Sequence, residues 1–376
     1  MVMRSRILFF YSSRDSGHHR AAQALQSAFS LHSNVETLAL DSIECAYPRM
    51  GRMIINGYTK VIKRIPQIWR VLYDNHDFAK ATRDIRKFFN WLYFSKMEEI
   101  LKEHKPDAII CTQAAPCHVA AAYKNEKGNG LPLVAVITDY LVHPYWLHDK
   151  VDLYIVPTEE TKETLVERGI PGRKIKEIGI PIDPKFMSSY DKLKKRAELG
   201  LPGEVTTLLI AGGSQGLIPV QRILRLLSQV NTPFQAIIVA GRNKRLWLRA
   251  KKMGKKLAFT TKVLSYTNSM DKLMDASDLI ITKPGGLTSA EALAKGLPLI
   301  IVKPIPGQEE RNGRYLIDQG AALAVEHLKD LPEVIEGLLL SPQKIEEMSR
   351  KAQLLARPKA AEEAAKAIME LVELVE

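Results

Sequence analysis

Eight short runs of consecutive apolar residues, each bounded by turn-forming residues, constrain the fold of this chain more than any other feature. The runs lie at residues 7–11, 107–112, 133–138, 153–157, 207–213, 236–241, 278–282 and 298–304. Runs this continuous are typical of parallel strands that are buried on both faces of a sheet. Helical patterns at residues 20–30, 159–168 and 290–295 lie between them. Strands that alternate with helices predict doubly wound α/β sheets.

The length of 376 residues exceeds what a single ordinary core accommodates, so two domains are expected. The proline-rich and charged stretch "GIPIDPKFMSSYDKLKKRAELGLPGE" separates the fourth run from the fifth. We therefore predict a first domain over residues 1–190 and a second domain over residues 191–345. A helical segment over residues 346–376, interrupted at Pro358, is expected to pack back on the first domain.

The net charge of +12 favours an anionic partner, namely nucleic acid, a nucleotide or an acidic membrane surface. The three cysteines are an odd number without CxxC spacing, which argues against a disulfide framework or a zinc site and favours a reducing cytoplasm. The first apolar run is too short for the core of a signal peptide. Nowhere do about 18 apolar residues follow one another, so any membrane contact is expected to be peripheral.

The loop after the first run, "SSRDSGHHRAAQAL", leads through Gly17 into a helix that carries His18 and His19. Ligands of open α/β sheets bind beyond the carboxyl ends of the strands, so this loop is a candidate site. Adjacent imidazoles on a helix point in different directions, and only one of them is expected to serve a single site. The alternative is an ordinary helix start that is capped by Asp15 or Ser16.

Two further loops are rich in glycine. "AGGSQGLIPVQRIL" matches neither the Walker loop nor the dinucleotide motif, yet its glycines allow backbone amides to approach a phosphate. "TKPGGLTSAEALAKG" opens a helix directly after Gly285. Unpaired N–H groups and about half a positive charge at a helix start also attract phosphate, although close packing would explain the glycines equally well.

A fourth loop, "KPIPGQEERNGRYL", follows a Pro-Gly turn with polar and acidic side chains. Carboxylates beside phosphate-binding loops would repel a phosphate, but they accept hydrogen bonds from sugar hydroxyls. Glu291, in the helix after Gly285, is suited to ribose hydroxyls for the same reason. Each of these carboxylates, taken alone, could simply be solvated.

Residues 49–105 carry 13 Lys and Arg against 6 Asp and Glu, together with nine aromatic residues. Within them, "RMGRMIINGYTKVIKRIPQIWRVLY" has apolar residues at roughly helical spacing with basic residues between them. This pattern suits an anionic lipid interface, and it also suits an ordinary helix packed on its own sheet. Single-stranded nucleic acid is a weaker alternative, because no recognised nucleic-acid module is present.

The segment "TDYLVHPYWLHDK" contains two histidines and an aspartate that suggest a metal site. No H-x3-H pair on a clear helix is present, Pro144 interrupts the segment, and the chain has no DxD-type motif. We therefore predict no metal centre.

Taken together, "GGSQG", "KPGGLTSAEALAKGLPLIIVKPIPGQEERN" and "VITDYLVHPYWLHDKVDLYIVPTEETKETLVERGIPGRKIKEIGIPIDPKF" resemble the motifs of one family. This family comprises the monogalactosyldiacylglycerol synthases and the processive diacylglycerol glucosyltransferases, and the likeness covers most of residues 5–325. It implies a GT-B fold, in which two Rossmann-like domains face a cleft. The lipid-linked N-acetylglucosaminyltransferase of cell-wall synthesis shares the glycine-rich loops but lacks the "HPYW" and "PGQE" features.

In the first loop, the resemblance implies that Gly17 and His19 correspond to the end of a glycine-rich turn and its histidine, the expected general base. His18 then replaces a glycine, and Arg14 stands where plant relatives carry an aspartate. Asp15 is the second catalytic candidate, by a shift of one position.

The resemblance also implies donor and acceptor contacts. The expected UDP-sugar contacts are Gly213, Ser214, Gln215, Tyr266, Met270, Gly285, Gly286, Thr288, Glu291, Gln308, Glu309 and Asn312. Among these, Tyr266 and Met270 belong to the segment that pairs with uracil, Glu291 to the ribose contact, and Gln308 and Glu309 to the sugar contact. The expected acceptor contacts are Gly17, Asp139, His143 and Trp146.

The predicted function is transfer of a hexose, with inversion, from UDP-glucose or UDP-galactose to diacylglycerol at an anionic membrane surface. The protein is expected to be cytoplasmic and peripheral on the inner face of the cell membrane. It is expected to bind no nucleic acid and to use no cofactor, since the UDP-sugar is a substrate and a divalent ion is not implied. One alternative is a UDP-N-acetylglucosamine-dependent transferase with a polyprenyl-linked acceptor, and another is a catalytically weak lipid- or nucleotide-binding protein. The identity of the hexose, the anomer, processivity and the oligomeric state stay open.

Overall fold

The computed structural model describes residues 5–14, 16–31, 34–46, 83–128, 130–214, 216–304 and 307–374. The chain forms two compact units, the first of residues 1–184, 306–308 and 359–376 and the second of residues 185–305 and 309–358. The boundaries predicted at residues 190 and 345 both lie within the second unit. The basic segment at residues 49–73 falls outside the described residues.

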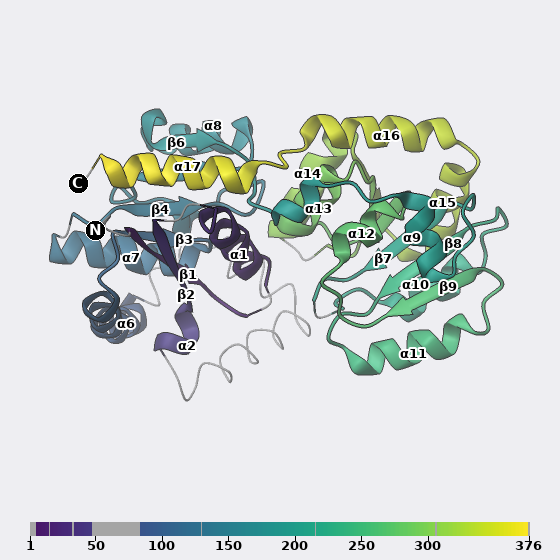
Figure 1. Cartoon of the computed structure of the whole chain (residues 1–376), viewed down its shortest axis with the longest axis horizontal. Helices are drawn as coiled ribbons and strands as arrows, with labels where there is room; N and C mark the ends of the chain where they lie inside the picture. The colour runs from purple at the N-terminus through teal and green to yellow at the C-terminus, as the bar shows by residue number, and fades with distance from the viewer. Residues whose placement is uncertain are drawn as a thin grey trace. The chain divides into compact units, whose positions relative to one another are not determined.

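Each unit contains a six-stranded parallel sheet, as expected for a doubly wound α/β fold (Figure 1). The first sheet has the order β2-β1-β3-β4-β5-β6 and the second β12-β11-β10-β7-β8-β9. The first comprises β1 Ser5–Tyr11, β2 Val35–Asp41, β3 Ala108–Cys111, β4 Leu133–Val136, β5 Leu153–Val156 and β6 Ile175–Glu177. The second comprises β7 Thr207–Ala211, β8 Gln235–Val239, β9 Thr260–Leu264, β10 Leu279–Thr282, β11 Leu299–Val302 and β12 Ala322–Val325.

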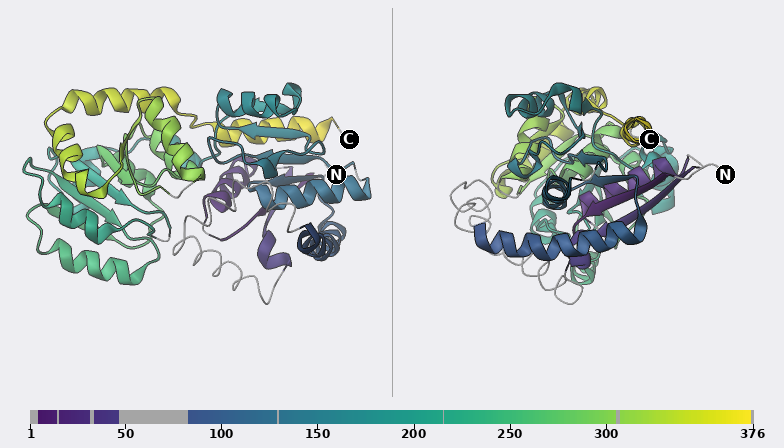
Figure 2. Two further views of the ribbon diagram at one scale, coloured as in Figure 1. Left: turned by 180° about the vertical axis from the view of Figure 1, so that it is seen from behind. Right: turned by 90° about the vertical axis from the view of Figure 1, so that its left-hand side faces the viewer.

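Helices cover both faces of the first sheet (Figures 1 and 2). They are α1 Gly17–Phe29, α2 Ser42–Ala46, α6 Arg83–His104, α7 Ala114–Lys127, α8 Glu159–Glu167 and α17 Ala360–Glu373. Alternate residues of β1 point to opposite faces, so Phe9 packs with α1 and α17 while Phe10 packs with α6 and α7. The last helix of the chain is therefore part of the core of the first unit.

The second unit contains α9 Lys192–Leu199, α10 Val220–Leu227, α11 Lys244–Gly254, α12 Met270–Asp275, α13 Gly286–Ala294, α15 Leu331–Leu339 and α16 Pro342–Leu355, with α14 Gln308–Asp318 beginning at its border. The core on one face of its sheet joins β7, β8, β10 and β11 to α10, α11, α15 and α16. The break between α16 and α17 contains Pro358, as predicted.

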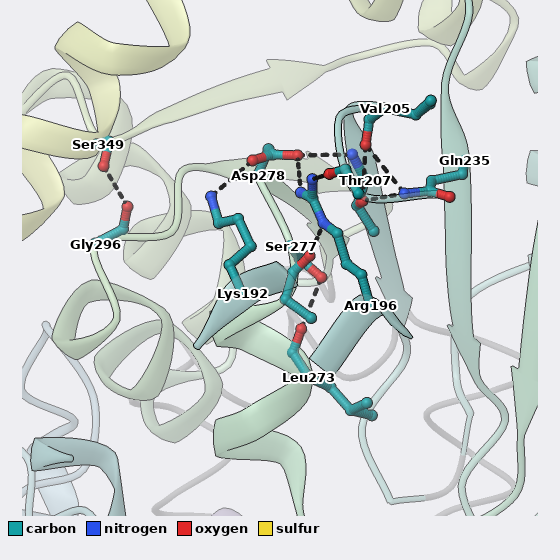
Figure 3. A network of polar contacts seen from close by, with 12 residues as sticks. Lys192, Arg196, Val205, Thr207, Gln235, Leu273, Ser277, Asp278, Gly296 and Ser349 are labelled. Atoms are coloured by element: carbon teal, nitrogen blue, oxygen red, sulfur yellow. Dashed lines mark hydrogen bonds and ion pairs between the residues drawn. The ribbon is translucent and has the colours of Figure 1, made fainter. Parts of the chain in front are cut away.

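A buried arginine fixes α9 to the start of the second sheet (Figure 3). Arg196 donates from Nε to the carbonyl of Ala276 at 2.9 Å and from Nη2 to Oδ2 of Asp278 at 2.6 Å. The same Asp278 oxygen accepts the backbone N–H of Thr207, the first residue of β7, at 2.7 Å. This network connects the helix that opens the second unit with its two central strands.

Across the residues that the structure describes, no helix is both long enough and apolar enough to span a membrane.

Candidate functional site

Polar side chains gather at the carboxyl edge of the first sheet. Thr112 directly follows β3, and Thr138 and Asp139 follow β4, which is the neighbouring strand. All three are buried. Hydrophobic packing does not require polar residues at these buried positions. Open α/β sheets bind their ligands at this edge.

His18 points from α1 to this edge. Ser16 caps the helix by accepting the backbone N–H of His19 at 3.2 Å, which fixes where the first helical turn begins. Nδ1 of His18 lies 3.0 Å from the carbonyl oxygen of Thr112 and 2.8 Å from Oγ1 of Thr138. The hydroxyl of Thr112 in turn donates to the carbonyl of His18 at 2.9 Å. The imidazole is thus held from two sides.

These contacts determine the chemistry of the His18 ring. A carbonyl oxygen only accepts, so Nδ1 carries the proton and the neutral ring has its lone pair on Nε2. Burial lowers the pKa of His18 below 6.5, although the carboxylate of Asp139 and the hydrogen bond to Thr112 oppose this effect. Within the described residues, nothing hydrogen bonds to Nε2. At neutral pH the ring is therefore a neutral base.

His19, the predicted base, occupies a different environment. Its ring stacks on the buried ring of Tyr11, at the end of β1, with the centroids 4.2 Å apart. The two histidines diverge, as expected from their helical positions. Nδ1 of His18 contacts Thr112 and Thr138, and the carboxylate of Asp139 raises the pKa of His18. The assignment of the base to His19 stays a prediction.

Of the other two predicted residues of the first loop, the structure describes only one. Gly17 is the exposed first residue of α1, whereas Asp15 lies outside the described residues.

Gln308, which groups with the first unit, donates from Nε2 to Oδ2 of Asp139. A residue predicted to contact the donor thus contacts a residue predicted to contact the acceptor.

The segment after Asp139 forms a short 3₁₀ turn, Pro144–Trp146. His143 caps this turn through Nδ1, which accepts the N–H of Tyr145 at 3.2 Å. Trp146 is only 3% exposed and packs in the core with α7. Trp146 can therefore shape the predicted acceptor site only by packing beneath the loop that follows Asp139.

In the second unit, the glycine-rich loop after β7 is folded tightly. Gly213 and Gly216 have φ of 73° and 59°, in the left-handed region that favours glycine. The carbonyl of Ser214 accepts the N–H of Arg242 at 2.8 Å, so the loops after β7 and β8 are joined. Gln215 lies outside the described residues.

The start of α13 differs from this loop because the fold itself does not require its glycine. Gly285 occupies the N-cap position without a side-chain cap, at φ −71°, which any residue adopts. A Cβ added there would meet no described atom within 4 Å. Packing, one of the two explanations for this turn, therefore does not account for Gly285, and the phosphate site at this helix start stays a prediction. Thr288, in the same first turn, is half-buried.

The helices that follow these loops carry buried polar side chains. Glu291 is only 4% exposed within α13, and Asn312 of α14 is fully buried. Glu309 forms a largely buried ion pair with Lys283, whose side chain also lies beside Gly213. Sequence reasoning did not assign Lys283 a role, because the signal was only a lysine before Pro-Gly-Gly. Its position places a cation between the glycine-rich loop and the predicted sugar contact.

The predicted uracil segment lies after β9. The guanidinium of Arg242 lies over the ring of Tyr266, 4.3 Å from its centroid, and Met270 begins α12. Arg242 thereby joins the β8 loop to this segment. Among the described residues, no group of three or more His, Cys, Asp or Glu side chains is arranged to hold a metal ion.

Comparison with known proteins covers both units. Residues 18–182 match the family model of monogalactosyldiacylglycerol (MGDG) synthase, and residues 207–368 match the C-terminal domain of glycosyltransferase family 28. The chain is 30% identical to the processive diacylglycerol beta-glucosyltransferase of Bacillus pumilus over 352 residues, which are 93% of this chain and 91% of that protein. Its counterpart in Bacillus subtilis is 30% identical over 355 residues, with the same coverage.

Solved structures agree on the fold. MurG of Acinetobacter baumannii superposes with a TM-score of 0.65 over 97% of this chain and 99% of that one, at 16% identity. Anabaena HepE in complex with UDP-glucose superposes with a TM-score of 0.59 over 97% and 99%, at 14% identity. At these identities the likeness concerns the fold alone, which is that of the GT-B glycosyltransferases. Since the chain is 30% identical to these Bacillus proteins over 93% of its length, it belongs to the processive diacylglycerol glucosyltransferase family.

Proposed function

We propose that the chain transfers glucose from UDP-glucose to the hydroxyl of diacylglycerol, with inversion at the anomeric carbon. The observation that carries this proposal is the 30% identity, over 93% of the chain, to proteins named diacylglycerol beta-glucosyltransferases. Glucose is α-linked in UDP-glucose, so a beta product requires inversion. Because those relatives are also named processive, we expect products with one and with several sugars.

On the acceptor side, we propose His18 as the general base. A neutral imidazole with its lone pair on Nε2 is suited to take the acceptor proton as the new C–O bond forms. Thr112 and Thr138 would hold the ring in that tautomer. The carboxylate of Asp139 would stabilise the imidazolium, since the two groups attract each other. This departs from the sequence-based preference for His19.

On the donor side, we propose that the diphosphate binds at the start of α13 and beside the loop after β7. Amides of Gly286 and its neighbours would stabilise the negative charge that develops on the leaving UDP. Lys283, next to Gly213, would add a positive charge. Glu291 would accept hydrogen bonds from ribose hydroxyls, and Glu309 from sugar hydroxyls, as the resemblance implies.

We further propose that the protein is cytoplasmic, works on the anionic inner face of the cell membrane and needs neither a cofactor nor a divalent ion. The basic composition of residues 49–105 and the lack of a DxD motif support these points. Transfer that is abolished by EDTA and restored by magnesium would contradict the last one.

The deciding experiment offers radiolabelled UDP-glucose, UDP-galactose or UDP-N-acetylglucosamine with diacylglycerol in anionic vesicles. We expect a labelled glucolipid from UDP-glucose and a slower reaction with the other two donors. A product only with UDP-N-acetylglucosamine and a polyprenyl phosphate acceptor would favour the cell-wall-type alternative. Binding of UDP without any transfer would favour a catalytically weak binding protein.

A further inference from the structure

A strongly basic stretch also lies in the second unit, apart from the basic residues 49–105. Residues 205–270 contain 11 Lys and Arg and no Asp or Glu, while the net charge of the whole chain is +12. Nine of these cations lie from Arg242 to Lys262, on the loop that precedes α11, on α11 itself, on the turn that follows it and on β9. In Figure 1, α11 lies on the outside of the second unit beside β9.

The outward side of α11 combines these cations with an exposed leucine. Leu246 and Ala250 are buried and face the sheet. Leu248 points the opposite way and is 51% exposed. Residues three and four positions away from it are its neighbours on the helix surface, and all four are basic. We call this surface the α11 face; it consists of Lys244, Arg245, Leu248, Lys251, Lys252 and Lys255.

Folding does not account for this arrangement. Lys244 and Arg245 lie in the first turn, where the helix dipole disfavours cations, and no acidic residue accompanies them. Lys251 and Lys252 lie in the last turn, where the helix dipole favours cations, but Lys251 and the C-cap residue Lys255 are four positions apart and repel each other. Within the part of the chain that the structure describes, no carboxylate forms an ion pair with the cations of the α11 face. The two cations at the start of α11 therefore cost stability unless an external partner neutralises them.

The α11 face continues into an open hollow. The hollow has a volume of about 530 Å³ and lies between the end of α11 and β9. Lys251, Lys255 and Lys262 line it, together with Thr260 and Thr261. Ammonium and hydroxyl donors around a hollow of this size suit a phosphate-bearing headgroup.

We propose that the α11 face binds the surface of an anionic lipid bilayer, with Leu248 entering the boundary between headgroups and acyl chains and the hollow receiving a headgroup phosphate. A leucine ringed by cations favours this occupant over nucleic acid, because acyl chains bury a leucine and a phosphate backbone does not. Lys251 also covers the ring of Trp247 at 5.1 Å, so this indole is not presented for stacking on bases. The inference rests on the proposed function, since it concerns how the second unit meets the membrane that holds the acceptor.

The test uses flotation of the full chain with vesicles of phosphatidylglycerol and phosphatidylcholine in equal parts, at low salt. The variant with Lys244→Gln, Lys251→Gln and Lys252→Gln should bind at least about tenfold more weakly, since each cation near an anionic surface contributes. The matched control carries Lys329→Gln, Lys344→Gln and Arg350→Gln, which are equally exposed cations of the second unit. It should bind within about twofold of the wild type. Equal binding by both triple variants would overturn the proposal.

A second measurement reports on the face directly. A polarity-sensitive fluorophore on Leu248→Cys, in a Cys45→Ser background, should shift to the blue with anionic vesicles and not with phosphatidylcholine alone. Cys111 and Cys117 are buried and escape labelling. Leu354, 65% exposed on α16, provides the control site, where no shift is expected. An unshifted label at residue 248, or affinity for poly(U) RNA that the α11 variant loses while its vesicle binding persists, would contradict lipid binding.

Transfer to water-dispersed dioctanoylglycerol separates this inference from the proposed function. Without a bilayer, the α11 variant should match the wild type, because no substituted residue belongs to the proposed donor or acceptor site. Absence of transfer by the wild type would refute the proposed function. Normal transfer to dioctanoylglycerol, together with unchanged activity of the α11 variant on vesicles, would refute membrane binding by the α11 face. It would leave the proposed function intact.

Discussion

His18 and His19 are adjacent in the chain, yet they occupy different chemical environments. The His18 ring is fixed by Thr112 and Thr138, and that of His19 by stacking on Tyr11. We expect His18→Ala to lower kcat by about 100-fold or more with little effect on UDP affinity, because a general base contributes mainly to the chemical step. His19→Ala should have a smaller effect. A larger loss of kcat for His19→Ala, with both variants folded, would restore the sequence-based assignment.

The pH dependence of transfer provides an independent test. Burial lowers the pKa of His18, so the base stays neutral and active until the pH falls below 6.5. The carboxylate of Asp139 raises this pKa, and Asp139→Asn removes that effect. The acidic limb of kcat/KM in the Asp139→Asn variant should therefore move to lower pH. A limb that stays in place, or moves to higher pH, would show that another group controls it.

A substitution at Gly285 tests donor binding separately from folding. Alanine at this position meets no described atom within 4 Å and adopts the same φ, so Gly285→Ala should reduce stability by less than about 1 kcal/mol. The added methyl group would occupy the space where a diphosphate approaches the start of α13. We expect the Kd for UDP, measured by calorimetry, to rise by about tenfold or more. Unchanged UDP affinity in a folded variant would remove the diphosphate from this turn.

At the level of elements, the second unit depends on one buried charge network. Arg196→Leu removes the buried guanidinium that bonds Asp278 and the carbonyl of Ala276 (Figure 3). Breaking a buried pair in this way should cost about 3 kcal/mol in urea unfolding. Lys192 also pairs with Asp278, at 2.9 Å, but it is half exposed, so Lys192→Ala should cost less than about 1 kcal/mol. Similar costs for the two variants would mean that burial of Arg196 is unimportant.

At the level of the whole molecule, the last helix of the chain, α17, completes the core of the first unit. Ile368 of α17 is fully buried in the core formed by β1 and α1, far from it in sequence. Ile368→Ala should destabilise the first unit by about 2–5 kcal/mol, while Leu374→Ala, at the exposed end, should change little. UDP binding by the second unit should survive both changes. If Ile368→Ala left thermal unfolding unchanged, α17 would not contribute to that core.

The sequence was sufficient for the two-sheet architecture and for the interior of each sheet, because a strand covered on both faces needs an unbroken apolar run. All eight predicted runs correspond to interior strands. The strands that the pattern missed, β2, β6, β9 and β12, are the four sheet edges. An edge strand is partly solvated, and in β9 this leaves Thr260 exposed and the other residues only half-buried, so no continuous run marks it.

The site divides in the same way. Glycine-rich turns and a helix start are local features, so the chain alone indicated the donor loops. The sequence also predicted that the C-terminal segment packs on the first domain, where α17 lies in the core. The tertiary structure alone decided which histidine meets Thr112 and Thr138 and that Lys283 pairs with Glu309. These contacts join residues between 26 and 120 positions apart, and periodicity, which compares only near neighbours, carries no information about them.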